Sequence, residues 1–162
     1  MSVNKYLPHV MVLPEDDANR QLANGFLRHE SVALRAIQVL SEVGGWGKVR
    51  DVFKEAHIAE MAKYTQRHMV LLVDFDGQQD RLEEMKTVIP DSLLDRVFVI
   101  GAWREPENLK RELGGFESIG CQLACECHGN RRDIWNHELL KHNVTELDRM
   151  IVALRPILFP SS

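Results

Sequence analysis

The sequence lacks any apolar run that approaches the roughly 18 residues needed to cross a membrane. It also lacks an excess of basic residues, since its net charge is -4, and no general positive field attracts nucleic acid. Its first residues lack the basic-then-apolar pattern of a signal peptide. It has only three cysteines, close together and odd in number, which argues against a secreted disulfide framework. We therefore expect a cytoplasmic protein without membrane contact.

Length and composition are ordinary for a globular protein. The chain has 162 residues, of which 44% are hydrophobic and 27% charged, enough to bury a sizeable core. It contains no repeat, low-complexity tract or linker. The sequence therefore predicts one domain over residues 1–162.

The stretch from Met69 to Gly77, MVLLVDFDG, runs from apolar residues into acids and a glycine. An unbroken apolar run of this kind predicts a strand buried on both faces, as in parallel sheets. Ligands bind beyond the carboxyl ends of such strands, and residues two apart on a strand share a face. Asp74 and Asp76 would then repel each other, and Mg²⁺, which prefers oxygen ligands, would relieve that repulsion. A solvated turn is the alternative interpretation.

Strands and helices alternate along most of the chain, which predicts an α/β fold with a mostly parallel four-stranded sheet flanked by helices. The predicted strands are 9–13, 33–40, 69–74 and 96–101. Helices are expected after residue 16, over 48–64, over 80–89 with Asp80 as its cap, and over 106–113. In the last third we expect a helix over 133–140 and a final helix from a capping box at Thr145 to Leu154, ended by Pro156.

Three consecutive acids, Glu15, Asp16 and Asp17, follow the first predicted strand. Asp16 or Asp17 can cap the next helix, because a carboxylate accepts hydrogen bonds from free N–H groups. Glu15, at the end of the strand, is not explained by capping. If the first and third strands are neighbours, Glu15 converges with Asp74 and Asp76 at the carboxyl edge of the sheet.

The last third also holds a cysteine-rich stretch, with Cys121, Cys125, Cys127 and His128. Structural zinc sites usually carry separated cysteine pairs, and this chain has no second pair. We therefore predict buried or free thiols and no bound zinc.

A Glu at the end of the first strand, followed by Asp-x-Asp at the end of a buried strand, resembles the Toprim domain. The resemblance covers roughly residues 10–113, and 114–162 is then a helical extension outside that core. It implies that Glu15 is a general acid/base or metal ligand and that Asp74 and Asp76 bind Mg²⁺ or Mn²⁺. The family often has Gly directly after its Glu where this chain has Asp16, which leaves room for a member that does not cleave.

The same acids resemble the motifs of two other families. Asp74-Phe75-Asp76-Gly77 is similar to the nucleophile motif of haloacid dehalogenase-like phosphatases, but Gln78 replaces its Thr and that motif usually follows the first strand. The acids Glu15, Asp16, Asp17 and Asp74 also resemble those of a phosphate-receiver domain. That domain has a Thr or Ser at the end of a later strand, where this chain has Gly101 and Ala102. It also has a Lys on a fifth strand, and no clear fifth strand with a Lys is visible here.

The Toprim resemblance implies an Mg²⁺-dependent phosphodiester-processing protein, a nuclease acting on nucleic acid. Similarity to small stand-alone relatives of the overcoming-lysogenization-defect nucleases implies, by analogy, a separate ATPase partner. A non-catalytic binding or regulatory protein that keeps the fold is the rival from another class. Thermal stabilisation by Mg²⁺ or Mn²⁺ distinguishes the two candidates. A catalyst should bind the metal and be stabilised by it, because a ligand that binds the folded state stabilises that state, whereas a relative that has lost its activity need not bind metal.

Overall fold

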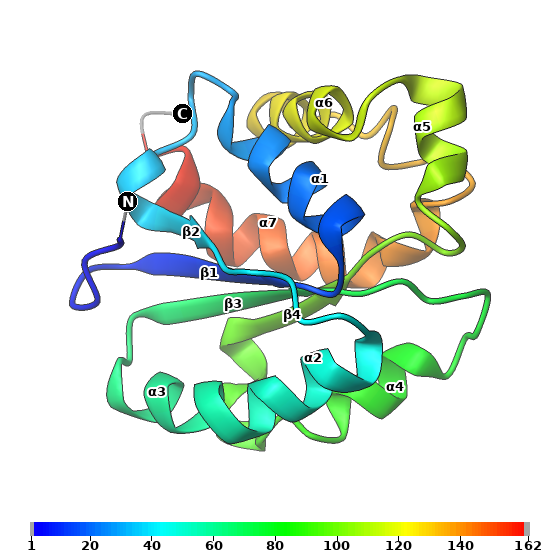
Figure 1. Ribbon diagram of the computed structural model, residues 1–162. Helices are drawn as coiled ribbons and strands as arrows, with labels where there is room; N and C mark the ends of the chain where they lie inside the picture. Colours follow the sequence, from blue (N-terminus) through cyan, green and yellow to red (C-terminus); the bar gives the residue numbers. More distant parts are fainter. Residues whose placement is uncertain (1, 161–162) are drawn as a thin grey trace.

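A computed structural model describes residues 2–160, which fold around one sheet of four parallel strands (Figure 1). The strand order is β2-β1-β3-β4, so that β1 and β3 are the central pair. The strands are β1 (His9–Pro14), β2 (Ile37–Val39), β3 (Arg67–Leu72) and β4 (Val97–Ile100). The predicted fold class, an α/β fold with a parallel four-stranded sheet flanked by helices, is confirmed.

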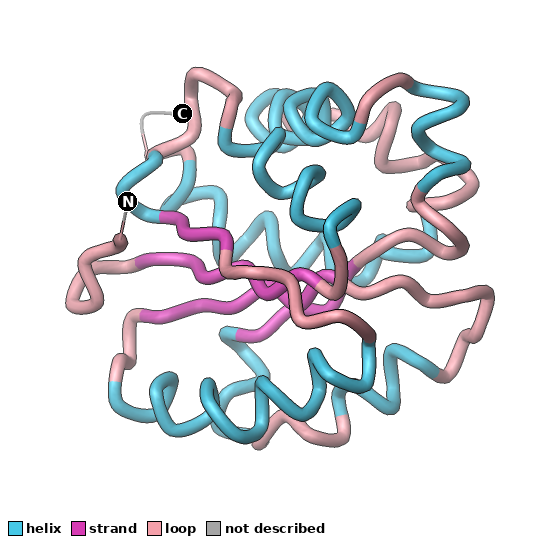
Figure 2. Tube along the Cα trace, viewed as in Figure 1, coloured by secondary structure: helices cyan, strands magenta, loops and turns pink. Residues whose placement is uncertain are grey.

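Two helical layers cover the two faces of the sheet (Figures 1 and 2). One layer contains α1 (Asp17–Leu27), α5 (Glu107–Leu113), α6 (Phe116–Gly129) and α7 (Val144–Leu158). The other contains α2 (Trp46–Val52), a π-helical turn (Phe53–His57), α3 (Ile58–Lys63) and α4 (Arg81–Lys86). Short 3₁₀ turns cover Leu34–Ala36, Asp91–Arg96 and Lys141–Asn143. None of the helices in residues 2–160 is both long enough and apolar enough to span a membrane.

The strands form where the sequence offers continuous apolar runs. All six residues of β1 and all four of β4 are buried, as expected for strands covered on both faces. The register places Val12 between Val39 and Val70, and Leu71 beside Val99. The central strands therefore end side by side at the same edge.

The predicted second strand, 33–40, is wrong in its first half. Residues Leu34–Ala36 form a 3₁₀ turn, and only Ile37–Val39 pairs with β1. The backbone N–H of Ala33 donates to the carbonyl of Leu158 at 2.8 Å, so the chain is held to the end of α7 before it reaches the sheet.

The predicted helix over 133–140 is wrong, and the structure has turns there. The buried carboxylate of Glu126 accepts from the backbone N–H groups of Ile134 (2.8 Å) and Trp135 (3.2 Å). This tertiary contact fixes the loop that enters the segment. The regular element of this region is α6, an unpredicted helix of 14 residues that contains the cysteine-rich stretch.

The predicted caps and end of the later helices also differ from the structure. Asp80 stands at the N-cap of α4 but makes no side-chain cap bond, and the capping box at Thr145 is absent, since Asn143 precedes α7. Pro156 lies inside α7, which continues to Leu158. The carbonyl four residues earlier belongs to Val152, which is 79% exposed, so water can replace the N–H that proline lacks.

The first and last parts of the chain meet where α1 crosses α6. A Cβ atom on Gly25 would lie 2.1 Å from the carbonyl oxygen of Glu117, and one on Gly120 would lie 2.0 Å from that of Leu22. The two helices therefore pack backbone against backbone. Buried apolar side chains of α6 and α7, such as Leu123 and Leu154, belong to the same core cluster as those of the sheet. The residues beyond 114 thus add α6 and α7 to the layer that also contains α1 and α5, and they share its core.

Candidate metal centre

Glu15 leaves β1 at the carboxyl edge of the sheet and is held against β3. Its backbone N–H donates to the carbonyl of Leu72 at 2.8 Å, which extends the pairing of β1 with β3 by one residue. Its side-chain Oε2 accepts from the backbone N–H of Asp74 at 2.6 Å. One carboxylate oxygen of Glu15 is therefore fixed by the loop after β3, and the other oxygen has no hydrogen-bond partner within residues 2–160.

Asp16 is the N-cap of α1, one of the two residues predicted for that role. Its Oδ1 accepts from the backbone N–H of Asn19 at 3.0 Å and from the side-chain Nδ2 of Asn19 at 2.9 Å. Only Glu15 and Asp16 separate β1 from α1, so the cap necessarily lies at the edge of the sheet. Asp16 thus has a structural role and a place at the candidate site.

Asp74 lies two residues beyond the end of β3 and is only 8% exposed. The chain stays extended here because Val73 N–H donates to Ile100 O (3.0 Å) and Phe75 N–H donates to Ala102 O (2.9 Å). The Asp74 Oδ1 accepts from Asn19 Nδ2 at 3.1 Å. Asn19 is fully buried and bonds to both aspartates, so it fixes Asp74 relative to Asp16.

These three carboxylates form one compact group. Each of Glu15, Asp16 and Asp74 offers an oxygen, and these oxygens all lie within 4.8 Å of one another. No ion pair to any of the three exists in the described part of the chain. An oxygen-only donor set with excess negative charge fits a hard divalent cation such as Mg²⁺.

The electrostatics of the group are dominated by burial and by the mutual repulsion of the carboxylates. The pKa of Asp74 is raised from 3.8 to about 8, mainly by burial and also by the neighbouring charges of Asp16, Glu15 and Asp76, against the lowering effect of the Asn19 hydrogen bond. Burial likewise raises the pKa of Glu15. In the metal-free protein, ionising this group at neutral pH therefore costs stability.

Asp76 lies close by but outside this compact group. It adopts a left-handed backbone conformation with φ of 51°, and its side chain is 53% exposed. Its Oδ2 accepts from Arg81 Nη1 at 2.8 Å, and the same nitrogen donates to the carbonyl of Asp74 at 2.6 Å. The structure thus brings Glu15 and Asp74 together as expected, adds Asp16, and pairs Asp76 with a cation.

Arg81, which the sequence did not single out, supports the loop that carries both aspartates. It is 5% exposed, and its guanidinium lies 4.6 Å from the centre of the Trp46 ring, an aromatic contact that favours a cation. Asn19 was also missed. Its position three residues after the cap, where N-cap contacts fall, was the only signal in the sequence, and nothing local predicts its bond to Asp74.

The cysteine-rich stretch lies on α6, on the helical layer rather than at this edge. Cys127 is buried, Cys121 and Cys125 are partly exposed, and all three are free thiols. Burial raises the pKa of Cys127 to about 12, which keeps it protonated. Nothing in this geometry gives these thiols a role in the carboxylate group.

Comparison of the chain with family models, with curated proteins and with solved structures gives no match. The Toprim resemblance therefore stays a prediction, and the function has to be argued from the site.

Proposed function

We propose that the carboxyl edge of the sheet binds a divalent cation, Mg²⁺ or Mn²⁺, and that the protein uses it to process phosphodiesters of nucleic acid. The observation that carries this proposal is the convergence of Glu15, Asp16 and Asp74, whose oxygens lie within 4.8 Å without a cation partner in residues 2–160. A bound cation of this kind neutralises charge on a phosphate and on its leaving oxygen.

The side chains divide naturally between holding and activating roles. Asp16 and Asp74, fixed by Asn19, would hold the ion. Glu15 has one oxygen committed to Asp74 N–H, and burial raises its pKa, which suits a base that takes a proton from water. Its free oxygen can instead complete the metal shell.

Two cations lie over glycines of the loops that flank the acidic group, and they support a phosphate-bearing substrate. The guanidinium of Arg104 lies over Gly77, within 3.3 Å of where a Cβ atom would stand. The side chain of Lys48 lies over Gly44, whose N–H donates to the carbonyl of Glu15 at 2.7 Å. Neither cation forms an ion pair in the described chain. Phosphate oxygens are the usual partners of such side chains in nucleic-acid complexes.

The test compares metal-dependent stability and cleavage in the parent protein, Asp74→Asn and Asp16→Asn. Asparagine is also a good N-cap, so Asp16→Asn keeps α1 while removing a charged ligand. Asp17→Asn is the matched control, because Asp17 is exposed and pairs with Arg20 outside the group. Melting is measured in EDTA, Mg²⁺ and Mn²⁺, and cleavage is measured on plasmid, single-stranded DNA and single-stranded RNA.

We expect the metal to raise the melting temperature of the parent and of Asp17→Asn, because a ligand that binds only the folded state stabilises it. That increase, and cleavage, are lost in Asp74→Asn and Asp16→Asn. Equal metal stabilisation of all four proteins refutes the site. Specific stabilisation without any cleavage favours the rival, a metal-binding regulatory protein.

We also propose a cytoplasmic location and, from the Toprim resemblance, a separate ATPase partner. The support for the location is chemical: three free thiols suit a reducing compartment. The ATPase partner rests on the analogy alone.

A further inference from the structure

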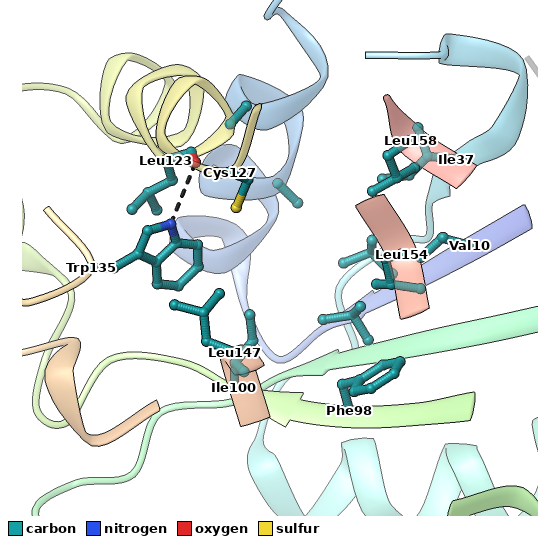
Figure 3. Close-up of a cluster of buried hydrophobic side chains, with 14 of the residues drawn as sticks. Val10, Ile37, Phe98, Ile100, Leu123, Cys127, Trp135, Leu147, Leu154 and Leu158 are labelled. Atoms are coloured by element: carbon teal, nitrogen blue, oxygen red, sulfur yellow. Dashed lines mark hydrogen bonds between the residues drawn. The ribbon is translucent and has the colours of Figure 1, made fainter. Parts of the chain in front are cut away.

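The helical layer that contains α1, α6 and α7 does not fill the space above the sheet. A cavity of about 100 Å³ lies between this layer and the strands. Figure 3 shows part of its wall, with Val10 on the sheet side, Leu154 from α7, and Leu123 and Trp135 on the far side. Nearly all of the lining is aliphatic or aromatic, so the cavity interacts poorly with water.

Two asparagines are the polar side chains of the lining, and they differ in how their atoms are used. Asn143 is satisfied: its Oδ1 accepts from Gly101 N–H at 3.1 Å, and its Nδ2 donates to the carbonyls of Gly101 and Leu140. Asn19 is half satisfied: its Nδ2 donates to Asp16 and Asp74, but its Oδ1 is buried and has no partner in the described chain.

The orientation of the Asn19 amide follows from these bonds. Both neighbours on its Nδ2 side are carboxylate oxygens, which accept hydrogen bonds, so the NH₂ group must face the acids. The Oδ1 atom then faces away from the acids. A fully buried carbonyl without a donor costs stability, and a donor within the cavity would remove that cost.

Water is a poor occupant, because a buried water needs about two to four polar partners and the cavity offers one free acceptor. Size narrows the choice of organic occupant. An apolar protein cavity of roughly 150 Å³ holds benzene. A cavity of about 100 Å³ suits a smaller molecule, such as a five-membered ring or a short branched chain.

We propose that this cavity is a binding site for a small, neutral, largely apolar molecule with a single N–H or O–H group, which donates to Asn19 Oδ1. The proposal is independent of metal binding. It does give Asn19 two functions, since the same amide that fixes Asp16 and Asp74 would also receive the ligand.

Pyrrole and furan are matched probes for this site, because the rings have the same size and only pyrrole has an N–H donor. Each is titrated into the full-length protein in EDTA, and methyl and amide NMR signals are followed. We expect saturable shifts at lining residues such as Leu123 and Leu154 with both probes. Pyrrole should bind about fivefold tighter, the value of one ordinary hydrogen bond. Equal affinities, or no shifts at the lining, overturn the proposal.

Three variants test the cavity and the Asn19 Oδ1 acceptor independently. Ala23→Leu places a larger side chain into the cavity and should abolish the shifts from both probes. Ala59→Leu adds the same atoms to an exposed position on α3 and should leave binding unchanged. Asn19→Leu, similar in size to the parent, should bind both probes equally.

If folded Ala23→Leu still binds pyrrole, the cavity is not the binding site. If Asn19→Leu still prefers pyrrole to furan, Asn19 Oδ1 is not the acceptor. If Ala23→Leu fails to fold, Ala102→Val tests the same space from the sheet side, because Ala102 also lines the cavity. Undiminished binding there overturns the proposal equally.

Discussion

The charged side chains at the two edges of the sheet differ in whether they have partners. At the amino edge, Arg67 Nε donates to His9 Nε2 at 3.0 Å, and the His9 Nδ1 donates to the Leu7 carbonyl. Arg96 donates to the carbonyls of Met61, Tyr64 and Arg67. At the carboxyl edge, three acids face one another without a cation partner in residues 2–160. The amino edge is therefore built for stability, while the carboxyl edge loses stability unless a ligand arrives.

Removing Arg96 should have the largest effect, because it leaves three carbonyls without their donor. We expect Arg96→Met to lower the free energy of unfolding by roughly 3–4 kcal/mol, measured by urea denaturation. The control is Arg35→Met, since Arg35 is exposed and contributes no hydrogen bond in the described chain. A loss below about 1 kcal/mol would show that the amino edge is not the stabilised one.

Neutralising Asp74 should do the opposite. The pKa of Asp74 is raised from 3.8 to about 8, so its proton favours the folded state, and that contribution is present at low pH and lost as pH rises toward 8. Asp74→Asn should therefore stabilise the metal-free protein at pH 8 by roughly 2–3 kcal/mol and change little at pH 4. Denaturation in EDTA at both pH values measures this, and destabilisation at pH 8 contradicts it.

His142, also at the carboxyl edge, makes stability depend on pH in the direction opposite to that of Asp74. Its ring packs edge-on against Phe75 and near Trp103, and burial lowers its pKa from 6.5 to about 4. The neutral ring is favoured in the folded state, so stability is lost as pH falls from 6.5 toward 4. His142→Phe should reduce that loss by roughly 1–2 kcal/mol in melts between pH 7 and pH 4. If the loss of stability between pH 7 and pH 4 is unchanged in the variant, groups other than His142 cause it.

Substitution of Asp76 should have the smallest effect on metal binding. It tests whether Asp76 is one of the metal ligands. If the ion is held by Glu15, Asp16 and Asp74, Asp76→Asn removes the charge of a half-exposed carboxylate, while its side-chain oxygen can still accept from the buried Arg81, at a cost of about 1 kcal/mol. Its Mg²⁺-dependent rise in melting temperature should then match the parent. Loss of that rise would instead support the set expected from the sequence, with Asp76 as a ligand.

The sequence predicted the sheet and two of these acids because the apolar runs of β1 and β3 are unbroken and each ends in carboxylates. The prediction for Asp76 assumed that the alternation of a strand continued through residue 76. In the structure β3 ends at Leu72, and the left-handed conformation of Asp76 turns the chain towards Arg81. Asp16 was predicted as a cap and belonged to an acidic group only in the phosphate-receiver alternative, because a sequence does not show that a cap and a strand end coincide.

The last third was predicted less well for reasons that lie in tertiary structure. The side chain of Glu126 accepts hydrogen bonds from Ile134 and Trp135, which no local pattern reveals. The helix α6 carries Gly120 at its crossing with α1, where propensity alone argues against helix. Both features depend on residues that are distant in sequence.

The backbone-to-backbone crossing of α1 and α6 has a consequence for how the protein is made. Gly25 can pack only after Glu117 of α6 has been synthesised, and at about 5–20 residues per second that takes roughly 5–20 s on the ribosome. During that interval the apolar face of α1, with Leu22 and Phe26, has no covering layer. We therefore expect nascent chains of this protein to bind chaperones that recognise exposed apolar helices until the final helices have left the ribosome.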